Sequence, residues 1–185
     1  MASRADVAAL SLREREYAVR VCTKTHVRVY RHPSGTMVLC LAERHLLRRL
    51  HGDGACALSA QLKMLRVREF QKGRGKSRQK GASKLQPGQW LISVLSQGTD
   101  SAQSGAPDDN RASRETTVDS PVHGFLVEIN DRLQAEPVLM ISDPDNCGFI
   151  AIFRAPGFGK SQTDGGFWNA LVSNEEYLSQ NAKQE

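Results

Sequence analysis

The feature that most constrains this sequence is how often turn residues interrupt its apolar stretches. The longest uninterrupted apolar run covers the six residues 37–42. A membrane-spanning helix needs about 20 apolar residues, so no membrane partner is expected. Short apolar runs that alternate with polar residues, or that are bounded by turns, are typical of β-strands. The sequence therefore predicts a mainly β protein with many short strands and one or two short helices.

Residues 26–42 carry the pattern of a β-hairpin. Val27 and Val29 alternate with polar residues, and a turn at 32–35 leads into the long apolar run. Alternation is typical of a strand with one polar face, whereas a continuous apolar run is typical of a strand buried on both faces. The pattern therefore places Arg28 at a polar position of the first strand and predicts that the second strand is buried.

The other expected elements follow from the same patterns. Residues 42–50 and the stretch after Ser173 predict short helices, the second because Ser173 and Glu176 have the spacing of a capping box. The segment 56–70 fits both periods in part, and the alternation at its end favours a strand. Further strands are expected at 90–96, in a bent pair at 116–130 interrupted by a proline and a glycine, and at 149–154.

The length of 185 residues suggests one domain with flexible segments. We expect a single domain over 21–178, preceded by a weakly ordered segment 1–20 and followed by a tail at 179–185. Two stretches inside the domain, 72–84 and 97–113, are rich in small and polar residues and lack large apolar ones. Such stretches cannot bury enough apolar surface to order themselves, so both are predicted to be flexible loops.

The net charge of +5 is concentrated in one segment. Residues 63–84 hold nine Lys or Arg and one Glu, a charge of +8, and the rest of the chain sums to −3. The segment could be a solvated loop, a nuclear import signal or a contact for polyanions with salt-dependent binding. Base stacking is not expected, because no aromatic residue lies between Phe70 and Trp90. The candidate docking or import residues are Lys72, Arg74, Lys76, Arg78 and Lys80.

No pattern in the sequence predicts catalysis, a metal site or a cofactor. The five histidines lack zinc-ligand spacing, and neither a nucleophile elbow nor a phosphate-binding loop is present. Asp143 and Asp145 flank Pro144, which favours a role in forming a turn. The four cysteines form no C-x-x-C pair, which favours reduced thiols. We therefore expect a protein that is not an enzyme.

The segment 119–154 resembles the second half of a biotinyl/lipoyl carrier domain, above all that of the glycine-cleavage H protein. The family pattern runs from Ser-Pro-Val-x-Gly through an apolar strand and an Asp-Pro turn to Gly-aromatic. The resemblance implies a barrel-sandwich hybrid fold, in which the prolines and glycines mark the turns. The matching residues are Ser120, Pro121, Val122, Gly124, Glu128, Asn130, Leu133, Pro137, Leu139, Asp143, Pro144, Gly148 and Phe149.

A carrier of this family needs a lysine at a hairpin tip before the matched segment, because the lysine amine holds the lipoyl or biotinyl group. Counted back from Pro121, that position falls near Ala112, and the sequence has no lysine between Lys84 and Lys160. A lipoyl carrier therefore stays a disfavoured alternative that would have to use Lys84.

Over roughly 25–178 the chain also resembles the Abitram family, also called Simiate, which lacks that lysine. The resemblance includes Leu41-Ala42-Glu43 followed by His45, the basic region, and the ending 171–177. The sequence departs from the family in 97–113, at Phe149 and in its first residues. The resemblance implies a non-catalytic interaction protein that binds actin, regulates actin polymerisation, is linked to transcription, and is found in the cytoplasm and the nucleus, including nuclear speckles. A salt-dependent nucleic-acid-binding module is the other alternative.

Overall fold

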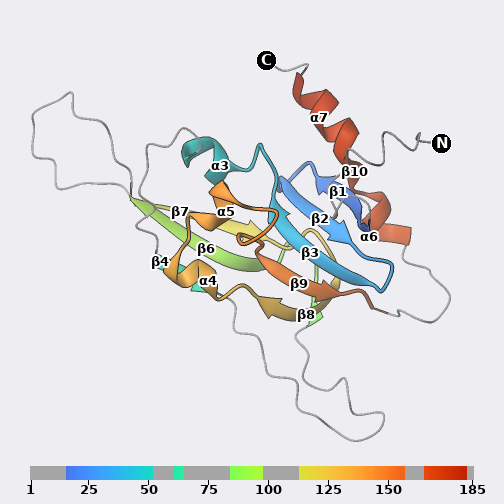
Figure 1. The fold of residues 1–185 in the computed structure, drawn as a ribbon, viewed down its shortest axis with the longest axis horizontal. Helices are drawn as coiled ribbons and strands as arrows, with labels where there is room; N and C mark the ends of the chain where they lie inside the picture. Colours follow the sequence, from blue (N-terminus) through green and yellow to red (C-terminus); the bar gives the residue numbers. More distant parts are fainter. Residues whose placement is uncertain (1–15, 52–60, 65–83, 98–112, 157–164, 183–185) are drawn as a thin grey trace, which may run out of the picture.

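The computed structural model describes residues 16–51, 61–64, 84–97, 113–156 and 165–182 (Figure 1). Within these residues the chain forms ten β-strands and five short helices. The strands make two sheets, and all the paired strands within them are antiparallel. The expected mainly β architecture is therefore confirmed.

The large sheet contains seven strands and is built around the predicted hairpin 26–42. The members, in chain order, are β1 (Ala18–Cys22), β2 (Val27–Arg31), β3 (Thr36–Leu41), β5 (Lys84–Leu85), β8 (Gly124–Ile129), β9 (Ala151–Arg154) and β10 (Val172–Ser173). The spatial order is β10–β1–β2–β3–β9–β8–β5. The interruption expected at Pro121 and Gly124 lies just before β8, which begins at Gly124. Within β8 itself the register shifts between Leu126 and Glu128.

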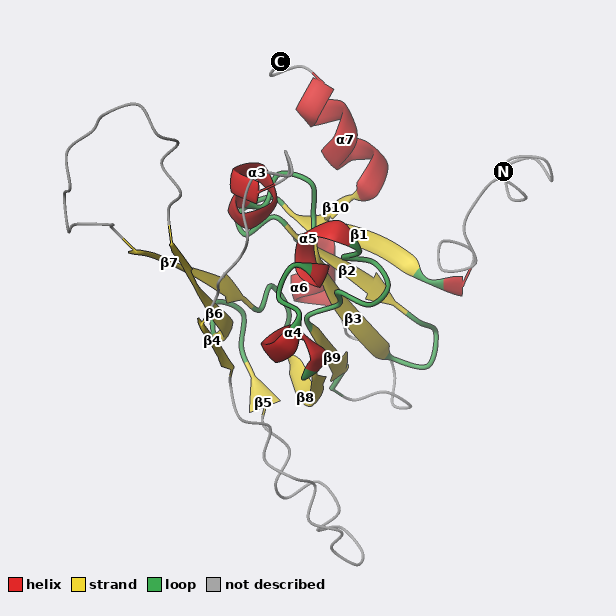
Figure 2. Ribbon diagram, turned by 60° about the vertical axis from the view of Figure 1, so that its left-hand side comes forward, coloured by secondary structure: helices red, strands yellow, loops and turns green. Residues whose placement is uncertain are grey.

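The small sheet consists of β4 (Gln61–Met64), β6 (Trp90–Gln97) and β7 (Ser113–Asp119), in the order β4–β6–β7. The predictions of a strand within 56–70 and of a strand at 90–96 are therefore confirmed for the described residues. Strands β6 and β7 form a hairpin in which Gln97 lies opposite Ser113. Figure 2 shows this sheet beside the large sheet.

The main hydrophobic core lies between the two sheets. Leu39 of β3 and Phe153 of β9, from the large sheet, and Ile92 of β6, from the small sheet, are all fully buried in one cluster. Alternate residues of a strand point to opposite faces, so these residues define the inner face of each sheet. The same cluster includes Val27, Val29, Met37, Leu41, Leu91, Val94, Val118, Leu126, Ile129 and Ala151.

The helices are short and more numerous than expected. They are α3 (Leu46–His51), α4 (Arg132–Ala135), α5 (Leu139–Ser142), α6 (Gly165–Asn169) and α7 (Asn174–Ala182). The predicted α3 and α7 are present, and the backbone N–H of Glu176 donates to Ser173 Oγ at 3.1 Å, as a cap requires. The prediction of one or two helices omitted α4, α5 and α6, because segments of four or five residues are too short to show a helical period.

Five predicted boundaries differ from those in the structure. Residues 18–20, expected in the weakly ordered N-terminal segment, belong to β1 and pair with β2. Residues 179–182, expected in the tail, extend α7. Lys84, Gln97 and Ser113, expected in loops, begin or end strands. The remaining parts of the two predicted loops, 72–83 and 98–112, lie outside the described residues.

The described helices can be compared with the requirements of a membrane-spanning helix. Among the described residues, no helix has both the length and the apolar character needed to cross a bilayer.

Candidate functional site

The outer face of the large sheet, opposite the core, carries the most specific polar chemistry of the described residues. Arg28 and Tyr30 of β2 point to this face, because they alternate with the core residues Val27 and Val29. In the register of the sheet, Tyr30 lies opposite Val38, and Val38 lies opposite Ile152. Both faces of β2 are therefore covered, and the predicted polar position of Arg28 is buried at 5% exposure.

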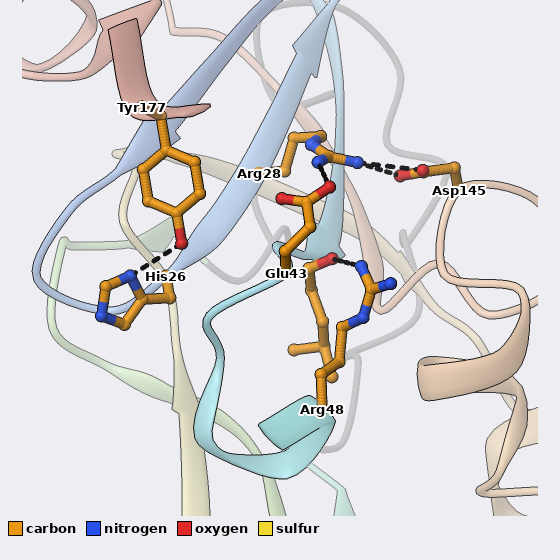
Figure 3. A network of polar contacts seen from close by, with 7 residues as sticks. His26, Arg28, Glu43, Arg48, Asp145 and Tyr177 are labelled. Atoms are coloured by element: carbon orange, nitrogen blue, oxygen red, sulfur yellow. Dashed lines mark hydrogen bonds and ion pairs between the residues drawn. The ribbon is translucent and has the colours of Figure 1, made fainter. Parts of the chain in front are cut away.

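Arg28 joins three distant parts of the chain (Figure 3). Its Nη1 donates to both carboxylate oxygens of Asp145, at 3.1 and 2.9 Å, and its Nη2 donates to Glu43. Its Nε is buried and has no hydrogen-bond partner among the described residues. One guanidinium therefore holds the loop around 145 and the segment after β3 against β2. Asp145 lies in the predicted turn, and its carboxylate binds Arg28, a contact that the turn prediction did not include.

The electrostatics of this cluster favour the charged forms of its ion pairs. Burial on its own would lower the pKa of Arg28, but Asp145 and Glu43 more than offset this and raise it. Burial would likewise raise the pKa of Glu43, yet a backbone hydrogen bond and Arg28 hold it below its usual value. Burial, followed by the charge of Asp145, raises the pKa of the neighbouring Tyr30. The cluster therefore stays ionised at Arg28 and Glu43, while Tyr30 keeps its proton at neutral pH.

The motif residues of 119–154 position Asp145. Buried Asn130 donates from Nδ2 to the carbonyl oxygens of Cys147 and Phe149, both at 2.8 Å. A Cβ on Gly148 would lie 1.9 Å from the carbonyl oxygen of Leu139, so only glycine fits there. Asp143 accepts from the backbone N–H of Cys147 at 3.0 Å, which confirms its turn role. Together these contacts hold the loop that carries Asp145 over the outer face.

The other motif residues also take structural positions. Pro121 and Pro144 are buried, and Pro137 is half-buried before α5. Gly124 is buried, and a Cβ there would lie 3.0 Å from the carbonyl oxygen of Arg154. Glu128 is exposed on β8. Of these residues, only Glu128 is exposed; the others are buried or half-buried, at turns or where two backbone segments approach closely.

A second polar group lies where α7 meets the sheet. The hydroxyl of Tyr177, which is 2% exposed, lies 2.9 Å from His26 Nδ1 (Figure 3). His26 has a φ of 51°, in the left-handed region, and occupies the turn between β1 and β2. Burial, with smaller contributions from Arg44 and Arg49, lowers the pKa of His26. The contact ties α7 to the β1–β2 turn.

His45 caps α3 from a buried position. The backbone N–H of Leu47 donates to His45 Nδ1 at 3.2 Å, the contact that a helix N-cap makes. Burial, with a smaller contribution from His26, lowers the pKa of His45 to about 4. Its imidazole is therefore neutral at pH 7, which the cap needs because a protonated Nδ1 cannot accept a hydrogen bond.

Beside the Arg28 cluster, the outer face has an open hollow of about 480 Å³. Aromatic and aliphatic side chains provide most of its lining, and the rings of Tyr17 and Tyr30 lie 6.4 Å apart, nearly perpendicular to each other. The residues that line it are Glu16, Tyr17, Tyr30, Val38, Asn146, Phe149 and Ile152. We refer to this site as the aromatic hollow.

No local sequence pattern predicts either the Arg28 cluster or the aromatic hollow. The partners Arg28 and Asp145 are 117 positions apart, and the hollow combines residues from β2, β3, β9 and the segments before β1 and β9. A useful indication was the mixture of long polar and aromatic side chains in β2. The predicted basic residues from Lys72 to Lys80 lie outside the described residues.

The described ends of the β6–β7 hairpin are Gln97 and Ser113. The position expected for a carrier lysine, near Ala112, lies outside the described residues, and the sequence has no lysine between Lys84 and Lys160. Lys84 lies on the edge strand β5 of the other sheet, opposite Phe125. The structure therefore does not bring Lys84 to this hairpin.

The described residues contain no cluster of three or more His, Cys, Asp or Glu side chains that could hold a metal ion. Among the described residues, Cys22, Cys40 and Cys147 form no disulfide bond, and Cys56 lies outside the described residues.

Comparison with known proteins supports the fold class. The glycine cleavage system H protein of Mycobacterium marinum superposes with a TM-score of 0.50 at 14% identity, over 89% of this chain and 97% of that one. The protein therefore has the biotinyl/lipoyl-like barrel-sandwich fold. No family model matches the sequence. The uncharacterized protein F54F2.7 of Caenorhabditis elegans is 47% identical over 51 residues, which span 28% of this chain and about a third of that protein.

Proposed function

We propose that this protein is a non-catalytic interaction protein that resembles the Abitram family and binds actin in the cytoplasm and the nucleus, with links to actin polymerisation and transcription. The observation that carries the proposal is a carrier fold without a carrier residue. The fold is that of the H protein, and the sequence has no lysine from 85 to 159. That stretch of the chain therefore lacks the amine on which carrier chemistry depends.

Charge supports an electrostatic part in the actin contact. The segment 63–84 holds a charge of +8, and clustered positive charge accelerates association with an acidic surface and makes it sensitive to salt. The same segment fits a nuclear import signal, in agreement with the proposed localisation.

Co-sedimentation with filamentous actin tests the proposal. We expect the full chain to pellet with filaments at low salt and less so as the salt concentration rises. Reversing the charge of Lys76, Arg78 and Lys80 to glutamate should weaken pelleting strongly. The matched control reverses Lys24, Arg132 and Arg154, three exposed basic residues of the folded domain, and should have little effect. No enrichment of the unmodified chain in the pellet at low salt would contradict actin binding.

The H-protein neighbour makes lipoyl carriage the second candidate. The position of Lys84 on an edge strand, away from the β6–β7 hairpin, argues against it. A third candidate, nucleic-acid binding through 63–84, predicts an affinity that falls steeply with salt and is lost in the Lys76, Arg78 and Lys80 variant. Equal binding of RNA or DNA by this variant and by the unmodified chain would remove that candidate.

A further inference from the structure

We propose that the aromatic hollow binds the cationic side chain of a lysine or arginine on an extended segment of a partner protein. This activity is separate from actin binding and does not depend on it. Three aromatic residues of the hollow, Tyr17, Tyr30 and Phe149, surround a space that is open to solvent. Aromatic faces attract cations through their quadrupole, and a cation that stays partly hydrated suits an open site.

The ring geometry supports a cation rather than a flat apolar group. Tyr17 and Tyr30 meet edge to face, at an interplanar angle of 85°. Two perpendicular rings give adjacent walls of different orientation, which suits a compact charge better than a planar ring that must stack on one wall. Val38 and Ile152, neighbours in the sheet register, form an aliphatic wall that can take the methylene stem of a lysine or arginine.

The acidic side chains at and beside the hollow have the negative charge that would attract a cation. The only acidic or basic residue among its lining residues is the exposed Glu16. Asp145 precedes the lining residue Asn146, and its side chain is 41% exposed while it binds Arg28. The side chain of Arg28 is only 6% exposed, and its guanidinium already binds two carboxylates. An incoming cation therefore meets a carboxylate at the rim, with the nearby positive charge neutralised by its own partners.

The volume of about 480 Å³ exceeds that of one lysine side chain and leaves room for the adjoining peptide. Phe149 and Tyr17 come from segments outside the regular strands, so the hollow lies between strand and loop residues of the outer face. An extended peptide would place one long side chain in the hollow and its backbone across the rim.

A peptide titration followed by backbone amide spectra tests the proposal. The probes are Gly-Ser-Gly-Xaa-Gly-Ser-Gly peptides with Lys, Arg, trimethyl-lysine, norleucine or Glu at the centre. We expect the three cationic peptides to shift the amide signals of Tyr30, Val38 and Ile152. The norleucine and Glu peptides should bind at least ten-fold more weakly. Equal binding of the lysine and norleucine peptides, or shifts confined to other surfaces, would overturn the proposal.

Two substitutions separate the contributions of charge and of the aromatic ring to peptide affinity. Tyr17→Leu keeps the apolar bulk but removes one ring face, and should weaken lysine-peptide binding about two- to five-fold. Glu16→Gln should weaken it to a similar extent and reduce its salt dependence. The matched control, Glu175→Gln, removes an exposed charge on α7 and should leave the affinity unchanged. Unchanged affinity in both hollow variants would contradict the assignment.

Arginines of this chain precede the lining residues Glu16 and Tyr17 in the sequence. A further set of substitutions tests whether they fill the hollow themselves. Replacing Arg4, Arg13 and Arg15 with serine in the full chain should leave the affinity for the lysine peptide unchanged. A ten-fold gain would show that the chain's own segment fills the hollow and would overturn the proposal. Actin pelleting that persists in Tyr17→Leu would show that the two activities are independent.

Discussion

Strands β2 and β3 are covered on both faces, but by different kinds of contact. On the inner face, Val29 and Leu39 are fully buried within the main hydrophobic core. On the outer face, Arg28 is also buried, yet its contacts are with the carboxylates of Asp145 and Glu43. Apolar burial is non-directional, whereas an ion pair with two carboxylates requires specific partners at specific positions.

The difference separates stability from specificity. A buried ion pair adds little over well-packed apolar residues, although breaking it on one side is costly. The inner face therefore supplies most of the folding free energy, and the outer face determines where the loop with Asp145 and the segment with Glu43 lie. That arrangement also shapes the aromatic hollow, because Asn146 and Phe149 follow Asp145 in the same loop.

The largest expected effect is on the inner face. Phe153 is fully buried, so Phe153→Ala should lower the free energy of unfolding by about 3–5 kcal/mol. The matched control is Ile152→Ala, the next residue of β9, which is half-buried on the outer face and should cost less than half as much. Urea denaturation measures both. Equal losses would contradict the division of the sheet into an inner face that packs in the core and an outer face that does not.

Removing Arg28 should have the second largest effect. Arg28→Met keeps much of the apolar stem but leaves Asp145 and Glu43 without their partner. We expect a loss of about 2–3 kcal/mol, reduced from the value for fully buried pairs because each carboxylate is 41% exposed. The exposed Arg154→Met should change stability by less than about 0.5 kcal/mol. If Arg28→Met were as stable as the unmodified chain, the ion-pair cluster would not hold the outer face together.

The third largest effect is the pH-dependent contribution of His45 to the free energy of unfolding. Because the folded pKa, about 4, lies below the ordinary value of 6.5, the unfolded chain takes up a proton first as the pH falls. Stability from this group is complete above 6.5 and is lost progressively between 6.5 and 4. His45→Asn keeps a cap acceptor and should remove about 2 kcal/mol of the loss between about pH 7 and pH 5. Identical pH profiles of variant and unmodified chain would contradict the buried neutral imidazole.

The smallest effect belongs to the contact between α7 and the β1–β2 turn. Tyr177→Phe removes the hydroxyl beside His26 and leaves the ring in place. We expect a loss of about 1 kcal/mol, the net contribution of one hydrogen bond, and faster amide exchange near His26. The control Tyr17→Phe, which keeps the ring that meets Tyr30, should leave exchange near His26 unchanged. Unchanged stability and exchange in Tyr177→Phe would assign the docking of α7 to apolar packing alone.

Much of the fold could be predicted from the sequence because its signals are local. The alternation in 26–31 and the apolar run 37–42 predicted β2 and β3, and the motif from Ser120 to Phe149 predicted the fold class. Helices α4 and α5 were missed because four residues cannot show a period. The partner of Arg28 could not be predicted, since no local pattern links positions 28 and 145 before the loop is folded over the sheet.

Intact-mass measurement after co-expression with a lipoate ligase tests the central claim, which is that this protein keeps the carrier fold without carrier chemistry. A glycine-cleavage H protein expressed in the same way serves as the positive control and should gain the mass of one lipoyl group. We predict that the unmodified chain shows no added mass. A lipoyl adduct on Lys84, or on any other lysine of the chain, would contradict the account.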